Sequence, residues 1–167
     1  DFEGIATGVE NTNYFVTTTA GRFVLTLFER LDRVHAQFYL DFMAHLAQRG
    51  IACPKPIADQ GQHFLSELNG KPATLVTRLS GQSDFNPDSH HCYEVGRALA
   101  RMHLASADFP ETLPNPRGPD WWVQAAARVT AYLHDDEREL LNEELRIQAQ
   151  GELNALPRGV VHADLFR

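Results

Sequence analysis

The last nine residues of the chain, GVVHADLFR at 159–167, place His162 and Asp164 directly after a short apolar run. Such a run reads as a buried strand that ends in a polar turn, where a carboxylate can reach a substrate. Asp164 therefore stands where a catalytic carboxylate is often found, with His162 two residues before it. Taken alone, His-x-Asp after a strand is more often a structural turn, so the elements before it must decide between the two interpretations.

A second group of candidate residues lies near the start of the chain, in the segment Gly8–Asn13. Gly8 permits a tight turn with free backbone N–H groups, and Glu10, Asn11 and Asn13 add polar side chains. Backbone and amide N–H groups of this kind can hold phosphate oxygens. The segment lacks the G-x-G-x-x-G pattern, however, and it is also compatible with an ordinary hairpin turn.

The composition is that of a globular protein. The chain has 167 residues, of which 43% are hydrophobic and 22% are charged, and its net charge is −7. Acidic residues are spread along the chain, so we expect no binding to nucleic acid or to an anionic membrane. No apolar stretch has the length of a membrane span and no leader is visible, so we expect a cytoplasmic protein. Cys53 and Cys92 are far apart in the sequence, and we expect both thiols to be reduced. Because the chain begins at Asp1 without a methionine, we expect both of its ends to be cut.

The first half of the chain has the pattern of strands. Thr, Val and Phe residues predict a hairpin formed by Asn13–Thr19 and Arg22–Phe28, with its turn at Ala20-Gly21 and a first strand ahead of it. An apolar stripe at helical spacing predicts a helix over His35–Gln48. The remaining strands are expected around Ile57, at His63–Leu65 and at Ala73–Leu79. These elements predict a five-stranded antiparallel sheet with one helix.

Beyond Gly81 the pattern changes from strands to helices. Three helices are expected: Asn86 or Asp88 to about Ser106, Pro119 to Leu133, and Asp136 to about Leu156. The predicted fold class is therefore α+β. Residues 1–80 would form a sheet-rich lobe, and residues 81–167 would form part of a helical lobe that ends inside the loop of Asp164.

Four segments carry a resemblance to a known family: Gly8–Val16, Phe23–Glu29, Tyr93–His103 and Val161–Asp164. Together and in this order, they resemble the bacterial homoserine kinases of the aminoglycoside phosphotransferase and choline kinase superfamily. The first two segments point to homoserine kinases in particular, whereas the last two are found across the superfamily. The resemblance implies a protein-kinase-like two-lobe fold that transfers the γ-phosphoryl group of MgATP to the hydroxyl group of L-homoserine, in threonine biosynthesis.

The same resemblance implies roles for individual residues. Asp164 would be the catalytic base, and His162 would support its loop. The nucleotide would contact eight residues: Gly8, Glu10, Asn11, Asn13, Thr26, Thr77, Arg78 and Leu79. The last three would read the adenine through their backbone. No metal ligand is assigned within the chain, because the ligands of Mg²⁺ would lie beyond Arg167. The implied partners are ATP and a small alcohol, and the oligomeric state stays open.

Thr26 departs from the general kinase pattern, since the third strand of a kinase normally carries a lysine here. A threonine can donate one hydrogen bond but brings no charge, so the countercharge must come from a metal ion or from an arginine such as Arg30 or Arg33. Two alternatives therefore remain: a kinase for choline, methylthioribose or an aminoglycoside, and a pseudokinase-like module that binds nucleotide without turnover. Without metal ligands, we expect the 167 residues themselves to be inactive.

Overall fold

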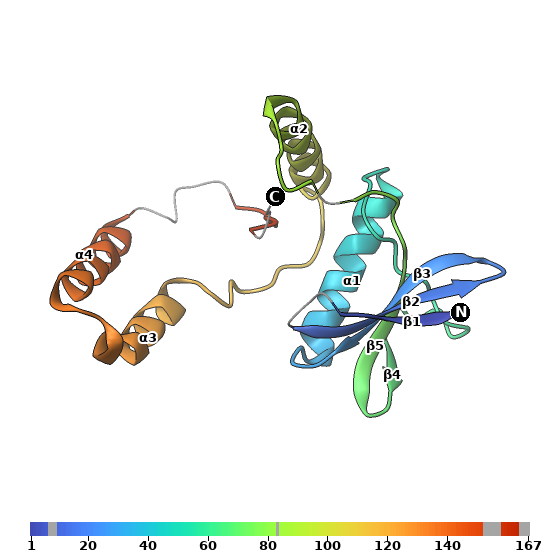
Figure 1. The fold of residues 1–167 in the computed structure, drawn as a ribbon, viewed down its shortest axis with the longest axis horizontal. Coiled ribbons are helices and arrows are strands. Elements are labelled where there is room, and N and C mark those ends of the chain that lie inside the picture. The colour runs from blue at the N-terminus through green and yellow to red at the C-terminus, as the bar shows by residue number, and fades with distance from the viewer. Residues whose placement is uncertain (7–9, 83, 152–157, 164–167) are drawn as a thin grey trace. The chain divides into compact units, whose positions relative to one another are not determined.

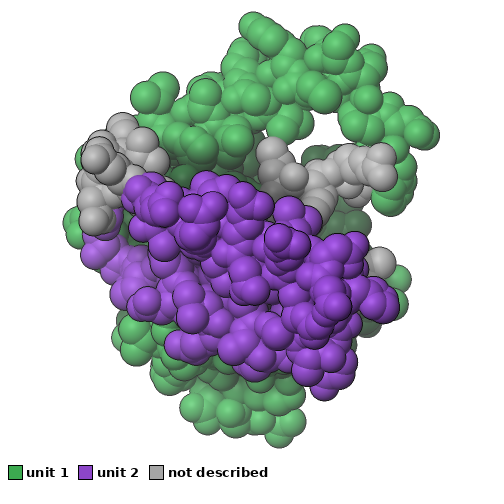
Figure 2. Space-filling view, turned by 90° about the vertical axis from the view of Figure 1, so that its left-hand side faces the viewer, with its two compact units in different colours: residues 1–111, 159–167 green, residues 112–158 purple. Residues whose placement is uncertain are grey.

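The computed structural model describes residues 1–6, 10–82, 84–151 and 158–163. The chain divides into two compact units, one formed by residues 1–111 with 159–167 and the other by residues 112–158, which are coloured separately in Figure 2. Figure 1 shows the sheet and the first two helices of the first unit and the helices α3 and α4 of the second. The lobe boundary near residue 80 stays a prediction.

The first unit contains an antiparallel five-stranded sheet with the strand order β1-β2-β3-β5-β4. The strands are β1 (Phe2–Ile5), β2 (Asn11–Thr18), β3 (Gly21–Phe28), β4 (Ser66–Leu68) and β5 (Lys71–Thr77). Thr18 lies opposite Gly21, so the turn of the predicted hairpin is Thr19-Ala20, one residue earlier than expected. Gly21 has a φ of 144°, which L side chains rarely adopt and which explains why β3 begins on a glycine.

The strands predicted around Ile57 and at His63–Leu65 are wrong in position. Near Ile57 there is an isolated bridge between Pro56 and Val76. Phe64 and Leu65 lie in the loop that follows, where they pack against the core, and β4 begins only at Ser66. Their apolar character therefore comes from core packing in a loop rather than from a strand.

Helix α1 (Arg33–Gln48) supplies most of the core of this unit. Asp32 caps its first turn by accepting a hydrogen bond of 2.9 Å from the backbone N–H of His35. The buried residues Ala36 and Leu40 form a cluster with Leu65. Phe28 of β3 packs against that cluster, so α1 covers the face of the sheet on which Phe28 lies (Figure 1). Burial of a side chain such as Leu40 contributes about 1.5–3 kcal/mol.

Helix α2 (Ser89–Ala105) begins at Asp88, one of the two predicted caps. The carboxylate of Asp88 accepts a hydrogen bond of 2.9 Å from the backbone N–H of His91. At the other end, the Ser106 hydroxyl donates to the carbonyl of His103 at 2.8 Å, which satisfies one of the last carbonyls of the helix.

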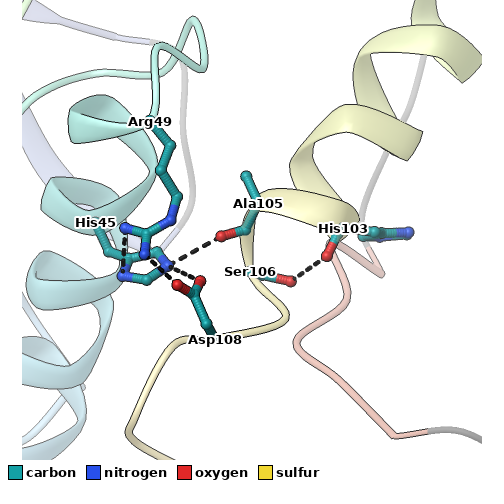
Figure 3. Close-up of polar contacts among 6 residues, drawn as sticks. All are labelled: His45, Arg49, His103, Ala105, Ser106 and Asp108. Carbon is teal, nitrogen blue, oxygen red and sulfur yellow. Dashed lines mark hydrogen bonds and ion pairs between the residues drawn. The ribbon is translucent and has the colours of Figure 1, made fainter.

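The chain that follows α2 is fastened to α1 at a site that we call the α1–α2 junction, made of His45, Arg49, Ala105, Asp108 and Phe109. Figure 3 shows its polar part: His45 Nε2 lies 2.9 Å from the carbonyl oxygen of Ala105, and Arg49 forms an ion pair with Asp108. Arg49 also contacts His45 Nδ1 at 3.1 Å. The ring of Phe109 lies edge-on to the ring of His45, with 5.0 Å between the ring centres. Polar and aromatic contacts therefore both hold this segment against α1.

The second unit is a pair of helices. Helix α3 (Pro119–Val129) begins with a proline, which suits the first position of a helix, and continues into a short 3-10 turn, Thr130–Tyr132. Helix α4 (Asp135–Gln150) ends earlier than the predicted Leu156, and residues 152–157 lie outside the described ranges. Within the described ranges, no helix combines the length and the apolar character required to cross a membrane.

Candidate active site

The register of the β2–β3 hairpin brings two of the predicted nucleotide-binding residues together. Asn13 lies opposite Thr26, and the Thr26 hydroxyl donates a hydrogen bond of 2.7 Å to Asn13 Oδ1. Both side chains are half-buried. Thr26 lies opposite Thr74 in turn, and directly opposed residues point to the same face of a sheet. This face is the one that α1 covers, because Phe28 lies two residues from Thr26 on the same strand.

The amide group of Asn13 has a defined orientation. Its oxygen accepts the hydrogen bond from Thr26, and its Nδ2 points toward the backbone carbonyl oxygen of Asn11 at 3.4 Å. A carbonyl oxygen can only accept, so the atom of the amide that faces Asn11 must be the nitrogen. The NH₂ group therefore points to the start of β2, next to the segment predicted to bind phosphate.

Arg78 adds a positive charge to the same face of the sheet. Its guanidinium carbon lies 3.7 Å from the centre of the Phe15 ring, and Phe15 follows Asn13 by two positions on β2. A cation–π contact at an exposed site contributes about 0.5–1 kcal/mol, so the side chain can exchange it for another partner at small cost. Sequence reasoning assigned Arg78 only a backbone role, but the pairing of β3 with β5 places its side chain on the face of Asn13.

The backbone N–H groups at the end of β5 are largely engaged within the protein. Thr77 donates to the carbonyl of Lys55 at 2.9 Å, and Arg78 donates to the carbonyl of Arg22 at 3.1 Å. The Thr77 hydroxyl accepts a hydrogen bond of 2.8 Å from the N–H of Lys55. Leu79 follows outside the strand and its side chain is half exposed.

The two arginines expected to supply a countercharge lie near the start of α1. Arg33 is its first residue and has a long contact of 3.9 Å with Glu67, while Arg30 is exposed in the turn after β3. Among the described residues, no polar contact joins Arg30 or Arg33 to Thr26 or Asn13. Arg78 lies on the face of these two residues through its contact with Phe15.

Sequence reasoning missed a charged group at the edge of the site, formed by Thr12, Glu29 and Lys71. Glu29 accepts a hydrogen bond of 2.6 Å from the Thr12 hydroxyl and forms an ion pair with Lys71. The hydrogen bonds from Lys71 and then from Thr12 lower the pKa of Glu29 below its ordinary value. Thr12 alternates with Asn13 along β2, so this group lies on the opposite face of the sheet. Lys71 consequently does not replace the missing lysine beside Thr26.

Part of the predicted catalytic segment is described. The prediction of a buried strand before His162 is wrong for these residues, because 158–163 form no strand and Val161 is 64% exposed. His162 is exposed, and the neighbouring Ala163 has a φ of 58°, in the left-handed region that residues other than glycine seldom adopt. Such outliers are found at functional sites and also in ordinary tight turns, so the catalytic interpretation of this turn stays a prediction. Asp164 and Gly8 lie outside the described residues, and Glu10 is exposed in the bend before β2.

No set of three His, Cys, Asp or Glu side chains within the described ranges is arranged to hold a metal ion. The pair His90 and His91 forms no such site: His91 instead contacts Asp88 through Nδ1 at 2.7 Å and Asp84 through Nε2 at 3.6 Å. The described residues therefore do not fit a complete Mg²⁺ site.

Solved structures with a similar arrangement are antibiotic kinases. An amicoumacin kinase in complex with AMP-PNP, Ca²⁺ and amicoumacin matches with a TM-score of 0.70 and 17% identity, over 98% of this chain and 53% of that chain. A spectinomycin phosphotransferase in complex with ADP and spectinomycin matches with a TM-score of 0.57 and 14% identity, over 78% of this chain and 40% of that chain. These likenesses confirm the predicted α+β fold of the protein-kinase-like type.

Similar sequences identify the family within this fold. The model of the phosphotransferase enzyme family APH matches residues 1–167, and the chain therefore belongs to that family. A homoserine kinase from Methylobacillus flagellatus is 48% identical over 100% of this chain and 52% of the relative. A homoserine kinase from Polaromonas naphthalenivorans is 47% identical over 100% of this chain and 54% of the relative. The chain spans about half the length of these curated relatives, and its resemblance to homoserine kinases is confirmed.

Proposed function

We propose that the protein is a homoserine kinase, which transfers the γ-phosphoryl group of ATP to the hydroxyl group of L-homoserine. The observation that carries this proposal is the 48% identity to a homoserine kinase along the full 167 residues. Antibiotic kinases share the fold at 17% identity and 14% identity, so their substrates are much weaker guides. The product would feed threonine biosynthesis, and the protein would act in the cytoplasm.

Asp164 would act as the general base of this reaction. It would accept the proton of the homoserine hydroxyl while that oxygen forms a bond to the γ-phosphorus and the bond to the β-phosphate oxygen breaks. His162 would hold the loop in place, and Ala163, which directly precedes Asp164, has a left-handed backbone with a φ of 58°. A general base contributes roughly 10²- to 10⁴-fold to the rate.

The nucleotide would lie along the face of the sheet that carries Asn13 and Thr26. Gly8–Asn13 would cover the phosphates, and Thr77–Leu79 would take the adenine. Since the N–H groups of Thr77 and Arg78 are engaged with Lys55 and Arg22, Leu79 is the best backbone candidate for a hydrogen bond to the base. The Arg78 side chain could leave Phe15 and supply positive charge near the nucleotide.

ATP and a divalent metal ion are the implied cofactors. The similar amicoumacin kinase was solved with AMP-PNP and Ca²⁺, which supports nucleotide and divalent-metal chemistry in this fold. We propose Mg²⁺ as the ion, which would neutralise charge on the phosphates. The described residues do not form a complete site for this ion.

The test is substrate-dependent release of ADP by the natural full-length chain that contains these residues. With ATP and Mg²⁺, ADP release should rise strongly on adding L-homoserine and little on adding choline, methylthioribose or an aminoglycoside. A preference for one of the other alcohols would replace homoserine as the substrate but keep the kinase. Binding of ATP without turnover of any of these alcohols would favour the pseudokinase-like module instead.

A further inference from the structure

The hydrogen bond between Thr26 and Asn13 links two side chains that have no charge. Both are half-buried on the covered face of the sheet, and the oxygen–oxygen distance of 2.7 Å is typical of a good hydroxyl hydrogen bond. The register fixes the two residues opposite each other on adjacent strands, so the contact does not depend on a flexible loop. A rigid pair of this kind can orient a third group.

The group that the pair orients is the NH₂ of Asn13. Thr26 donates to Oδ1 of Asn13, so the amide oxygen faces Thr26 and the nitrogen faces Asn11. A flipped amide would place its oxygen against the carbonyl oxygen of Asn11, and the two oxygens would repel each other. The contact from Nδ2 to Asn11 is long, at 3.4 Å, so it leaves donor capacity for a stronger acceptor. Anionic phosphate oxygens are such acceptors, and hydrogen bonds to charged groups are shorter and stronger than neutral ones.

We propose that Thr26 is a positioning residue, whose hydroxyl fixes the Asn13 amide so that its NH₂ donates a hydrogen bond to a phosphate oxygen of the bound nucleotide. This inference rests on the proposed function. Asn13 would make the contact with the phosphate. Thr26 would not touch the nucleotide and would act only by orienting Asn13. Loss of the Thr26 hydroxyl should therefore weaken the binding of ATP but not the binding of adenosine, which has no phosphate.

Four variants of the natural full-length chain separate this role from a structural one. Thr26→Val has nearly the same shape but cannot donate, and Thr26→Ser restores the hydroxyl. Asn13→Asp still accepts from Thr26 but loses the NH₂ and adds a negative charge. The matched control is Thr74→Val, because Thr74 lies beside Thr26 in the sheet, is buried, and donates to the carbonyl of Phe64 at 2.9 Å.

The readouts are dissociation constants for ATP and adenosine, together with the thermal unfolding midpoint. Thr26→Val should weaken ATP binding about tenfold, in line with the loss of one hydrogen bond to a charged group, and leave adenosine binding unchanged. Thr26→Ser should restore ATP binding, and Asn13→Asp should weaken it at least as much as Thr26→Val. Thr74→Val should lower the unfolding midpoint and keep both dissociation constants.

Each result supports or overturns the inference. Unchanged ATP binding by Thr26→Val, or an equal loss of ATP and adenosine binding, would overturn it while leaving the kinase proposal intact. Should Thr26→Val fail to fold, Asn13→Asp decides, since wild-type ATP affinity in that variant excludes a phosphate contact from its NH₂. Wild-type protein that binds no ATP would instead overturn the proposed function, and the inference with it.

Discussion

Asp164 directly follows Ala163, whose backbone has a left-handed φ of 58°. We expect Asp164→Asn to lower kcat for homoserine phosphorylation by roughly 10²- to 10⁴-fold, because the amide cannot accept the hydroxyl proton. The dissociation constant for ATP should change little, since the carboxylate acts on the alcohol. Steady-state kinetics and ATP titration of the natural full-length chain check this.

The control for this prediction is Asp136→Asn, which removes a carboxylate from the exposed first turn of α4. Its kcat should stay within about twofold of the wild-type value, as is usual for an exposed site. If Asp164→Asn behaves like this control, Asp164 is not the base.

The sequence predicts Asn13 and Thr26 as nucleotide-binding residues but does not by itself predict that they contact each other. Their pairing follows from the position of the hairpin turn. Once the turn is placed at Thr19-Ala20, the period of an antiparallel hairpin requires Asn13 to lie opposite Thr26. A turn at Ala20-Gly21, as the strand pattern predicts, would instead place Asn13 opposite Phe28. The side-chain contact of Arg78 with Phe15 required knowledge that β5 pairs with β3, and no local pattern contains that.

Helix α1 packs on the sheet through a few buried side chains. Leu40 is 1% exposed, and we expect Leu40→Ala to lower the free energy of unfolding by about 2–5 kcal/mol through lost burial and a residual cavity. Val34 on the same helix is 74% exposed, so Val34→Ala should change it by less than about 0.5 kcal/mol. Chemical denaturation measures both. Equal effects would mean that α1 does not pack as described.

The first turn of α2 is held by a capping box, in which Asp88 accepts from the His91 N–H and His91 Nδ1 lies 3.3 Å from the Asp88 nitrogen. Asp88→Ala removes the acceptor for the His91 N–H, so we expect the thermal unfolding midpoint to fall by about 2 °C. Asp88→Asn keeps an acceptor of the same shape and should retain most of the wild-type midpoint. Differential scanning calorimetry would distinguish the two variants. A large loss in Asp88→Asn as well would assign the stabilisation to the contact of the carboxylate with the His91 ring rather than to the cap.

An apolar sequence pattern does not distinguish a strand from a loop that packs against the core, as the segment His63–Leu65 shows. Phe64 and Leu65 have the apolar character of a strand, but they contribute to the core from a loop beside α1. The dipeptide Asn69-Gly70 predicts the position of the β4–β5 hairpin more reliably. Its φ angles of 54° and 74° match the two-residue turn that an Asn-Gly pair favours. Reading that turn first would have ended one strand at Leu68 and begun the next at Lys71, as observed.

Several hydrogen-bonded carboxylates, which belong to different parts of the chain, make the stability of the fold depend on pH. The groups whose pKa values lie below their ordinary values are Glu29, Asp32, Asp59, Asp88 and Asp108. Each therefore binds a proton less readily in the folded chain than in the unfolded chain. Their stabilising contribution is present above the unfolded pKa values, near 4, and is lost as the pH falls through the folded ones.

We therefore expect the unfolding midpoint of the natural full-length chain to be level at neutral pH and to fall as the pH drops below about 4. Arg49→Met should make the fall smaller, because the hydrogen bond from Arg49 is the largest cause of the lowered pKa of Asp108. Thermal unfolding across a pH series checks both. A midpoint that rises on acidification between pH 5 and pH 3 would contradict the prediction.

Strand β4 ends the sheet on one side, and it has only three residues, with Glu67 at its centre. A row of unpaired backbone groups at a sheet edge can pair with strands of other molecules, and long, flat edges are the most prone to such pairing. A three-residue edge that carries a charge offers little template for such pairing. This side of the sheet is therefore protected against fibril-like association while the apolar residues Phe64 and Leu65 stay in the core beside it.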